Sequence, residues 1–244
     1  AELERQGVLD NTVIIVMSDN GSPFPRCKTR VYDSGMKTPL VVFWPDGIKG
    51  KGAVTESLVS AVDIAPTILE LADVEVPEGY QGKSFVPILD DPSAAIRSIV
   101  YAEHNWHDYA AHERMVRTSD FMYVRNARPQ LANGGPADSK GSPTQHALNR
   151  VRDRGELTPA QADIFVTPRP REELYDVKKD PFQLVNIASL PEYRDMLAAM
   201  RNLLDNWQTA TGDTTPDDLT PDWYDRETGK ALDIERKRGV MPGR

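Results

Sequence analysis

Two apolar runs with little polar alternation lie in the first part of the chain. Residues 13–17 read Val-Ile-Ile-Val-Met, and residues 40–44 read Leu-Val-Val-Phe-Trp. Consecutive apolar and β-branched side chains are typical of a strand that is buried on both faces of a parallel sheet. A polar loop that begins near Asp19 connects the two runs. The pattern therefore predicts two strands of an α/β sheet, with polar side chains at the carboxyl end of the first strand.

A helix is predicted after the second run. Residues 63–72 place apolar side chains at helical spacing, with Asp63 where an N-cap is expected and Pro66 in the first turn. The apolar stripe consists of Ile64, Ile68, Leu71 and Ala72. Residues 90–92, Asp-Asp-Pro, form a polar turn that ends this part of the chain. We therefore place a domain boundary after residue 92.

The pattern changes beyond this boundary. Residues 98–103, 114–118 and 121–126 are short strand-like runs separated by polar turns, which predicts a small antiparallel sheet. Residues 129–171 are polar and rich in Pro and Gly at first, and then carry two capping-box signals, at 142–145 and 158–161. We interpret this segment as an insertion that contains two short helices.

The end of the chain contains one long amphipathic segment. Residues 190–209 carry a single apolar face, and a capping box that starts at Ser189 opens the helix. The face consists of Met196, Leu197, Met200, Leu203, Leu204 and Trp207. From residue 213 on, repeated Asp, Thr and Pro predict an extended surface tail. The predicted domains are therefore 1–92, 93–212 and 213–244.

Composition narrows the class of protein only a little. The 244 residues carry a formal net charge of -8, which argues against nonspecific binding to nucleic acid. No apolar stretch reaches the length of a membrane span, and the single cysteine excludes an intrachain disulfide. Residue 1 already lies in a helix-like Glu-Leu-Glu-Arg segment, so we expect the chain to continue a longer fold.

The polar residues after the first run are candidates for metal binding. The Asp19 carboxylate and the Asn20 amide oxygen are two hard donors that suit Ca²⁺ or Mg²⁺, and ligands of α/β sheets bind at the carboxyl ends of strands. The alternative is turn chemistry, because both side chains can accept or donate local backbone hydrogen bonds before Gly21. Residue types alone leave both interpretations open.

The order of motifs resembles the sulfatase family. In that family a strand ends in Asp-Asn-Gly or Asp-His-Gly, a loop presents a lysine or arginine before a Tyr-acid-x-Gly segment, and a Pro-Leu-led strand closes on Trp-Pro. Residues 18–25, Ser-Asp-Asn-Gly-Ser-Pro-Phe-Pro, and residues 28–45 contain each element in this order. The spelling of residues 18–25 is most similar to the sulfamidase, or heparan N-sulfatase, branch. Residues 81–89 and 173–188 resemble later family segments.

The resemblance implies a fold and a set of roles. The fold is part of an alkaline-phosphatase-like α/β domain, with a mostly parallel sheet flanked by helices, and a smaller C-terminal α+β subdomain with a short antiparallel sheet. Asp19 and Asn20 are expected to bind one divalent ion, Ca²⁺ first and Mg²⁺ as the alternative. Lys28 is the catalytic cation that steadies the sulfate, and Arg30 is a second candidate. The substrate is a sulfated saccharide, either N-sulfoglucosamine or an O-sulfated glycan.

The same resemblance places substrate contacts downstream. Three of the four histidines of the chain lie between His104 and His112. Sulfatases of this branch line the substrate pocket with a loop at the start of the C-terminal subdomain, so we expect His104 and His107 to contact the sugar. The alternative is a polar loop in which a backbone group satisfies each histidine.

Part of the family's catalytic apparatus is absent from these residues. The sulfatase nucleophile is a formylglycine made from Cys or Ser in a Cys/Ser-x-Pro/Ala-x-Arg motif. Cys27 has Val31 where the motif needs Arg, and Ser22 has Phe24 where it needs Pro or Ala. The resemblance therefore implies that the N-terminal half of the same protein supplies the nucleophile and the remaining metal ligands. We expect the chain alone to be inactive.

Two functions stay open at this point. The first is a sulfohydrolase, for which the family implies a periplasmic, secreted or lysosomal location. The second is a noncatalytic fragment or pseudoenzyme that binds anionic glycans. A phosphoryl-transfer enzyme of the same superfamily is less favoured, because no Asp-x-x-x-His pattern with a downstream His is evident for two zinc ions.

Overall fold

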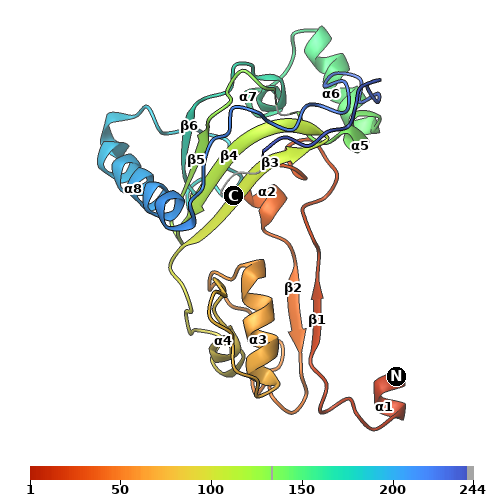
Figure 1. The fold of residues 1–244 in the computed structure, drawn as a ribbon, viewed down its shortest axis with the longest axis vertical. Helices are drawn as coiled ribbons and strands as arrows, with labels where there is room; N and C mark the ends of the chain where they lie inside the picture. Colours follow the sequence, from red (N-terminus) through yellow and green to blue (C-terminus); the bar gives the residue numbers. More distant parts are fainter. Residues whose placement is uncertain (133, 241–244) are drawn as a thin grey trace. The chain divides into compact units, whose positions relative to one another are not determined.

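The computed structural model describes residues 1–132 and 134–240 (Figure 1). The chain divides into two compact units. The first comprises Ala1–Ser18 and Pro39–Val100, and the second comprises Asp19–Thr38 and the chain from Tyr101 onward. The segment 19–38, which connects the two predicted strands, therefore packs with the C-terminal part of the chain. The predicted domains 1–92, 93–212 and 213–244 stay a prediction.

The first unit contains one small sheet and four short helical elements. Strand β1 (Ile14–Met17) pairs with β2 (Leu40–Phe43) in antiparallel register, from Ile14 opposite Phe43 to Met17 opposite Leu40. The helical elements are α1 (Glu2–Arg5), η1 (Ala61–Asp63), α3 (Ile64–Leu71) and α4 (Val86–Asp90).

The expected parallel sheet is not found in the part of the chain that the structure describes. Both sheets there are antiparallel, and the side chains of β1 and β2 are half exposed, with Val16 at 58% and Val41 at 56%. The apolar runs predicted the strands correctly. They could not predict strand direction, because an apolar run records which side chains avoid water and not the direction of the neighbouring strand.

Asp63 organises the first unit from a fully buried position. Its Oδ2 accepts a hydrogen bond from the Ser60 amide at 2.8 Å, which completes a capping box, and its Oδ1 accepts one from the Lys83 amide at 2.7 Å. The Arg97 guanidinium also donates to Oδ1. Asp63 was predicted to cap the helix with its side chain, but it makes no such bond to α3; it completes the capping box of Ser60 on η1 and connects this turn to two later segments.

The second unit is built on a four-stranded antiparallel sheet. The strands lie in the order β3 (Val100–His107), β4 (Tyr109–Arg117), β5 (Phe121–Asn126) and β6 (Glu172–Asp176). This confirms the predicted small antiparallel sheet. One difference concerns His104 and His107, which were expected in a loop and lie in the edge strand β3. Edge strands tolerate polar side chains because one face and one edge stay near water.

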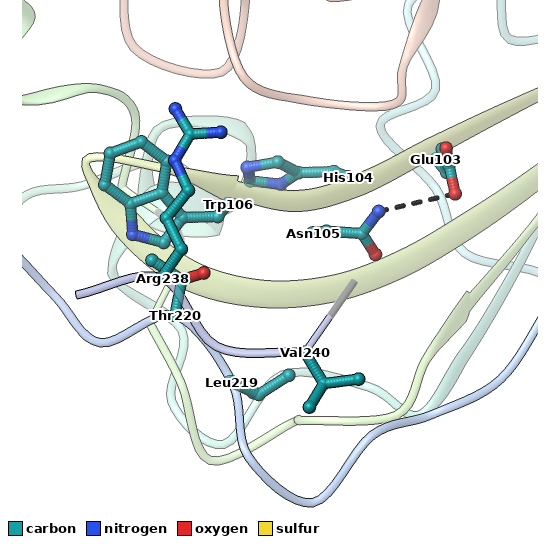
Figure 2. Close-up of a pocket in the computed structure, with 8 residues that line it drawn as sticks. All are labelled: Glu103, His104, Asn105, Trp106, Leu219, Thr220, Arg238 and Val240. Atoms are coloured by element: carbon teal, nitrogen blue, oxygen red, sulfur yellow. Dashed lines mark hydrogen bonds between the residues drawn. The ribbon is translucent and has the colours of Figure 1, made fainter. Parts of the chain in front are cut away.

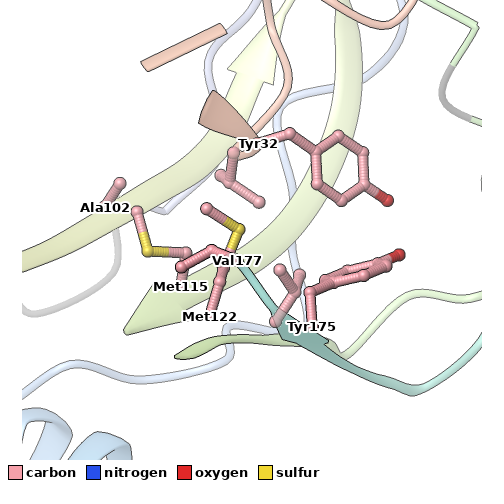
Figure 3. Close-up of a cluster of buried hydrophobic side chains, with 8 residues drawn as sticks. Tyr32, Ala102, Met115, Met122, Tyr175 and Val177 are labelled. Carbon is pink, nitrogen blue, oxygen red and sulfur yellow. The ribbon is translucent and has the colours of Figure 1, made fainter. Parts of the chain in front are cut away.

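The core of this unit includes residues from the 19–38 segment. Val31 and Tyr32 pack with sheet residues in one buried cluster (Figure 3). These partners are Ala102, Met115, Met122, Val124 and Tyr175 of the sheet, and Val177, the residue after β6. The Tyr32 and Tyr175 rings meet edge to face, with centroids 5.9 Å apart. This packing fixes the segment to the sheet.

Short helices and a tail surround the sheet. They are α2 (Asp33–Met36), α5 (Ala137–Lys140), α6 (Pro143–Asp153), α7 (Pro159–Ala162), η2 (Asp163–Phe165), η3 (Pro191–Tyr193) and α8 (Arg194–Thr211). Ser142 and Thr158 each accept a hydrogen bond from the amide three residues on, and Thr158 completes a capping box. Among the described residues, the capping box expected at Ser189 is not found: η3 begins after Leu190 and α8 after Tyr193, and neither of these residues makes a side-chain cap. Helix α8 buries Leu197, Met200 and Leu204. Within the described residues, no helix has the length and apolar character that a membrane crossing requires.

Candidate functional site

The segment 19–38 folds as a compact loop that presents Lys28. The Gly21 amide donates to the Gly35 carbonyl at 2.9 Å and closes the loop. A Cβ at Gly35 would collide with the carbonyl oxygens of Cys27 and Arg30, so this close approach requires glycine. The loop also contains Thr29 with a φ of 68°. The tight fold places Lys28 at the surface, with 20% of its side chain exposed.

Ion pairs hold both ends of this loop. The Arg117 guanidinium donates to both carboxylate oxygens of Asp33, at 2.9 and 3.1 Å. Arg26 donates to Asp163 at 2.9 Å and lies 4.0 Å above the Tyr32 ring. A bidentate arginine pair is directional and fixes both partners. The loop that carries Lys28 is therefore held by β4 and by η2 as well as by its own hydrogen bonds.

A buried polar network lies beneath the loop around Tyr32. The Tyr32 hydroxyl donates to Glu173 Oε2 at 2.5 Å and accepts hydrogen bonds from Arg169 at 2.8 Å and from Arg30 at 3.1 Å. Arg169 also donates to Glu173 Oε1 at 3.0 Å. Burial raises the pKa of Tyr32, the charge of Arg30 opposes this rise, and the charge of Glu173 adds to it. The Tyr32 hydroxyl therefore stays protonated and can donate.

Lys28 and His107 lie in one chain of contacts. Lys28 Nζ is 2.7 Å from Asp138 Oδ2. The backbone amide of Ala137, the residue before Asp138, donates to Asp108 Oδ2 at 2.9 Å. His107 Nε2 lies 3.7 Å from the same oxygen. The structure therefore brings together two of the predicted site residues, Lys28 and His107, through the segment that carries Asp138.

His104 and the charge of Arg30 both act on Glu113. His104 Nδ1 lies 3.2 Å from Glu113 Oε2. Burial alone would raise the pKa of Glu113, but the hydrogen bond with His104 and the charges of Arg30 and Arg169 lower the pKa to about 2. Arg30 is only 1% exposed. This burial favours Lys28 over Arg30 as the cation that meets a ligand, and leaves Arg30 a role in holding the network.

A small cavity opens beside His104 (Figure 2). Its volume is about 240 Å³, and strand β3 and the tail line it. The lining residues are Glu103, His104, Asn105, Trp106, Leu219, Thr220, Arg238 and Val240. His104 Nε2 is buried without a hydrogen-bond partner among the described residues. An indole, an imidazole and a guanidinium around one hollow are chemistry that suits an acidic sugar.

Asp19 and Asn20 follow β1 at the start of the loop. Asp19 is exposed, and its Oδ1 accepts a hydrogen bond from the Asn20 amide at 3.0 Å. The Asn20 Nδ2 donates to the Gly21 carbonyl at 2.7 Å, which is the turn chemistry foreseen as the alternative. Ca²⁺ takes about six to eight oxygen ligands, so the two side chains fit part of a site. Within residues 1–132 and 134–240, no group of three or more His, Cys, Asp or Glu is placed to hold a metal.

Sequence reasoning missed Asp138, Asp108, Arg169 and Glu173. Glu173 begins the segment 173–188, which was matched to the family without a role in the site, and Asp138 lies in the segment interpreted as an insertion. Lys28 and Asp138 are 110 residues apart, and Tyr32 and Glu173 are 141 apart. The available signal was the clustering of charged residues beside predicted strands, which does not identify partners.

Comparison with known proteins identifies the class of protein. Residues 27–130 match the family described as N-sulphoglucosamine sulphohydrolase, C-terminal. The chain is 37% identical over 214 residues to an ulvan-active sulfatase of Formosa agariphila, covering 87% of this chain and 35% of that protein. It is 32% identical over 225 residues to N-sulphoglucosamine sulphohydrolase of Homo sapiens, covering 87% and 44%.

The fold is also similar to solved structures. The structure of BT4656 in complex with its substrate D-glucosamine-2-N,6-O-disulfate aligns with a TM-score of 0.58 and 25% identity, over 85% of this chain and 36% of that chain. The chain belongs to the sulfatase family and corresponds to its C-terminal region. It spans 35% and 44% of the length of the two curated relatives named above.

Proposed function

We propose that this chain is part of a sulfohydrolase that acts on a sulfated sugar, with N-sulfoglucosamine or an O-sulfated glycan as substrate. The observation that carries the proposal is the presentation of Lys28 on a loop that is held by two ion pairs, one from Asp33 to Arg117 of β4 and one from Arg26 to Asp163 of η2. The sulfatase names of the relatives support the reaction class, and the sulfated glucosamine bound in the similar structure supports the substrate class.

Each predicted residue has a role in this proposal. Lys28 attracts and orients the sulfuryl group through its charge, at a point where 20% of the side chain is exposed. Asp19 and Asn20 hold one divalent ion, Ca²⁺ or alternatively Mg²⁺, together with ligands from outside this chain. Such an ion supplies Lewis-acid stabilisation of the sulfate oxygens. A formylglycine from the N-terminal half of a longer protein is the proposed nucleophile.

The sugar side of the site is proposed to lie along β3. His107 is 43% exposed in its side chain and adjoins the Asp108 and Asp138 segment near Lys28. His104 lines the cavity with its unsatisfied Nε2. A buried ring nitrogen without a partner costs about 1–3 kcal/mol, which a sugar hydroxyl can recover by hydrogen bonding.

A noncatalytic glycan-binding protein is the second candidate. Both candidates use Lys28 for the anion, so only turnover separates them.

Released sulfate is the deciding measurement. The full-length protein, matured by a formylglycine-generating system, is supplied with N-sulfated and with 6-O-sulfated glucosamine. The proposal expects sulfate release from at least one of them. No release from either supports the noncatalytic candidate.

The metal assignment is tested by Asp19→Ala. We expect loss of both bound calcium and turnover, measured by elemental analysis and sulfate release. Asp46→Ala is the matched control, because Asp46 is also exposed and follows the other strand of the same sheet, β2. An Asp19→Ala protein with unaltered calcium content would remove the assignment.

A further inference from the structure

Lys28 already has a carboxylate partner in this structure. Its Nζ lies 2.7 Å from Asp138 Oδ2, while 53% of the Asp138 side chain stays exposed. A ligand anion that approaches Lys28 therefore meets a cation beside an anion and not an isolated positive charge. The local charge of the pair is zero.

The segment that carries Asp138 is firmly held. The Ala137 amide donates to Asp108 at 2.9 Å, and the Ser139 hydroxyl, almost fully buried, donates to the Pro136 carbonyl at 2.8 Å. Lys140 is also buried, with Nζ 3.4 Å from the Gly134 carbonyl. The Ala137 amide thus ties the backbone beside Asp138 to the residue before β4, and the two buried residues after it hold the segment compact, which keeps the Asp138 carboxylate close to Lys28.

We propose that Asp138 is a specificity-determining residue that makes the Lys28 site select singly charged anions over doubly charged ones. The inference rests on the proposed function, since it assumes that Lys28 receives the anion. A sulfate ester or a sulfamate carries one negative charge, whereas a phosphate monoester carries about 1.5 to 2 at pH 7. Repulsion from a fixed carboxylate grows with the charge of the ligand, so the phosphate monoester loses more affinity than the sulfate.

Partial exposure limits the size of the effect. Water screens a half-exposed carboxylate, so we expect Asp138 to weaken phosphate monoester binding by about tenfold and sulfate monoester binding by about threefold. The ratio of the two affinities is therefore the quantity that Asp138 controls. A residue that only anchored the loop would change both affinities alike.

Calorimetric binding of phenyl sulfate and phenyl phosphate tests this. The full-length protein is produced without the formylglycine-generating system, so that no turnover interferes, and Asp138→Asn is compared with wild type at pH 7.5. Asp138→Asn keeps the shape of the side chain and removes its charge. We expect the phosphate affinity to rise at least threefold more than the sulfate affinity, and Asp138→Glu to keep the wild-type ratio.

Asp120→Asn is the matched control. Asp120 pairs with Lys178 at 2.5 Å, with 47% of its side chain exposed, and it lies in the turn at the other end of β4 from Asp108. The nine residues of β4 span about 30 Å at about 3.3 Å each. This is beyond the screening length of about 10 Å at 0.1 M salt. We expect no change in either affinity.

The outcomes separate this inference from the proposed function. An unchanged affinity ratio in Asp138→Asn, or wild type that binds neither ester, overturns the inference. Failure of sulfate release by the matured protein overturns the sulfohydrolase and leaves the binding ratio as a separate result. Lys28→Gln is expected to abolish binding of both esters, and retention of binding in that variant also contradicts the inference.

Discussion

Removal of Arg169 is the sharpest test of how the loop 19–38 is held. The side chain is 1% exposed and donates to Glu173 Oε1 at 3.0 Å, to the Tyr32 hydroxyl at 2.8 Å and to the Asp163 carbonyl at 2.9 Å. The substitution Arg169→Met keeps much of the volume and removes the charge. It leaves the carboxylate of Glu173 buried without its cation.

The magnitude follows from what remains around Glu173. Breaking a buried ion pair by removing one partner typically costs about 3–5 kcal/mol. Tyr32 and Tyr175 still donate to Oε2, at 2.5 and 2.7 Å, and soften the loss. We therefore expect the lower end, about 3 kcal/mol in the free energy of unfolding, or a Tm decrease of about 6–12 °C.

Urea and thermal unfolding of the full-length protein measure this loss. Arg201→Met is the matched control, since Arg201 pairs with Glu172 while 42% of its side chain is exposed. An exposed pair of this kind contributes about 1 kcal/mol or less. The double variant Arg169→Met with Glu173→Gln should regain part of the loss, because no charge is then buried alone. A cost for Arg169→Met no larger than that of Arg201→Met would refute the reasoning.

Two further predictions concern buried carboxylates. The pKa of Glu113 is lowered to about 2, so its contribution to stability is present above its ordinary pKa and is lost as pH falls from about 4.5 toward 2. In urea unfolding, Glu113→Gln should therefore lose less stability over that pH range than wild type. Equal losses in the two proteins would contradict this. Asp63→Ala leaves Arg97, whose side chain is 13% exposed, and two backbone amides without their buried acceptor, and should lower the unfolding free energy by about 3 kcal/mol. A loss below about 1 kcal/mol would contradict the role given to Asp63.

Local signals in the sequence predicted local structure well. The N-cap at Ser142, the capping box at Thr158 and the apolar face of α8 depend on residues a few positions apart in the sequence, and each is present. The order of motifs in residues 18–45 identified the family and Lys28 as a candidate. These features need no knowledge of distant partners.

Features that depend on distant partners were not predictable. The pair Lys28 and Asp138 joins residues 110 positions apart, and no periodicity records it. The burial of Arg30 is of the same kind, since arginine on a polar loop is normally exposed and is covered here by the Tyr32 network. The antiparallel pairing of β1 and β2 also depends on how a connection of more than twenty residues returns, which apolar runs do not encode.

The central claim is that Lys28 is the cation that meets the sulfuryl group, and Lys28→Gln tests it most directly. In the matured full-length protein, kcat/KM for the sulfated sugar should fall by at least about 100-fold, the effect of removing one group that stabilises developing charge. The half-exposed pair with Asp138 is worth about 1 kcal/mol or less, so the unfolding free energy should change little. Lys178→Gln is the control, because the Lys178 side chain is 70% exposed and pairs with Asp120. The account is contradicted if kcat/KM of Lys28→Gln stays within about threefold of this control, which is a difference of less than 1 kcal/mol in transition-state binding.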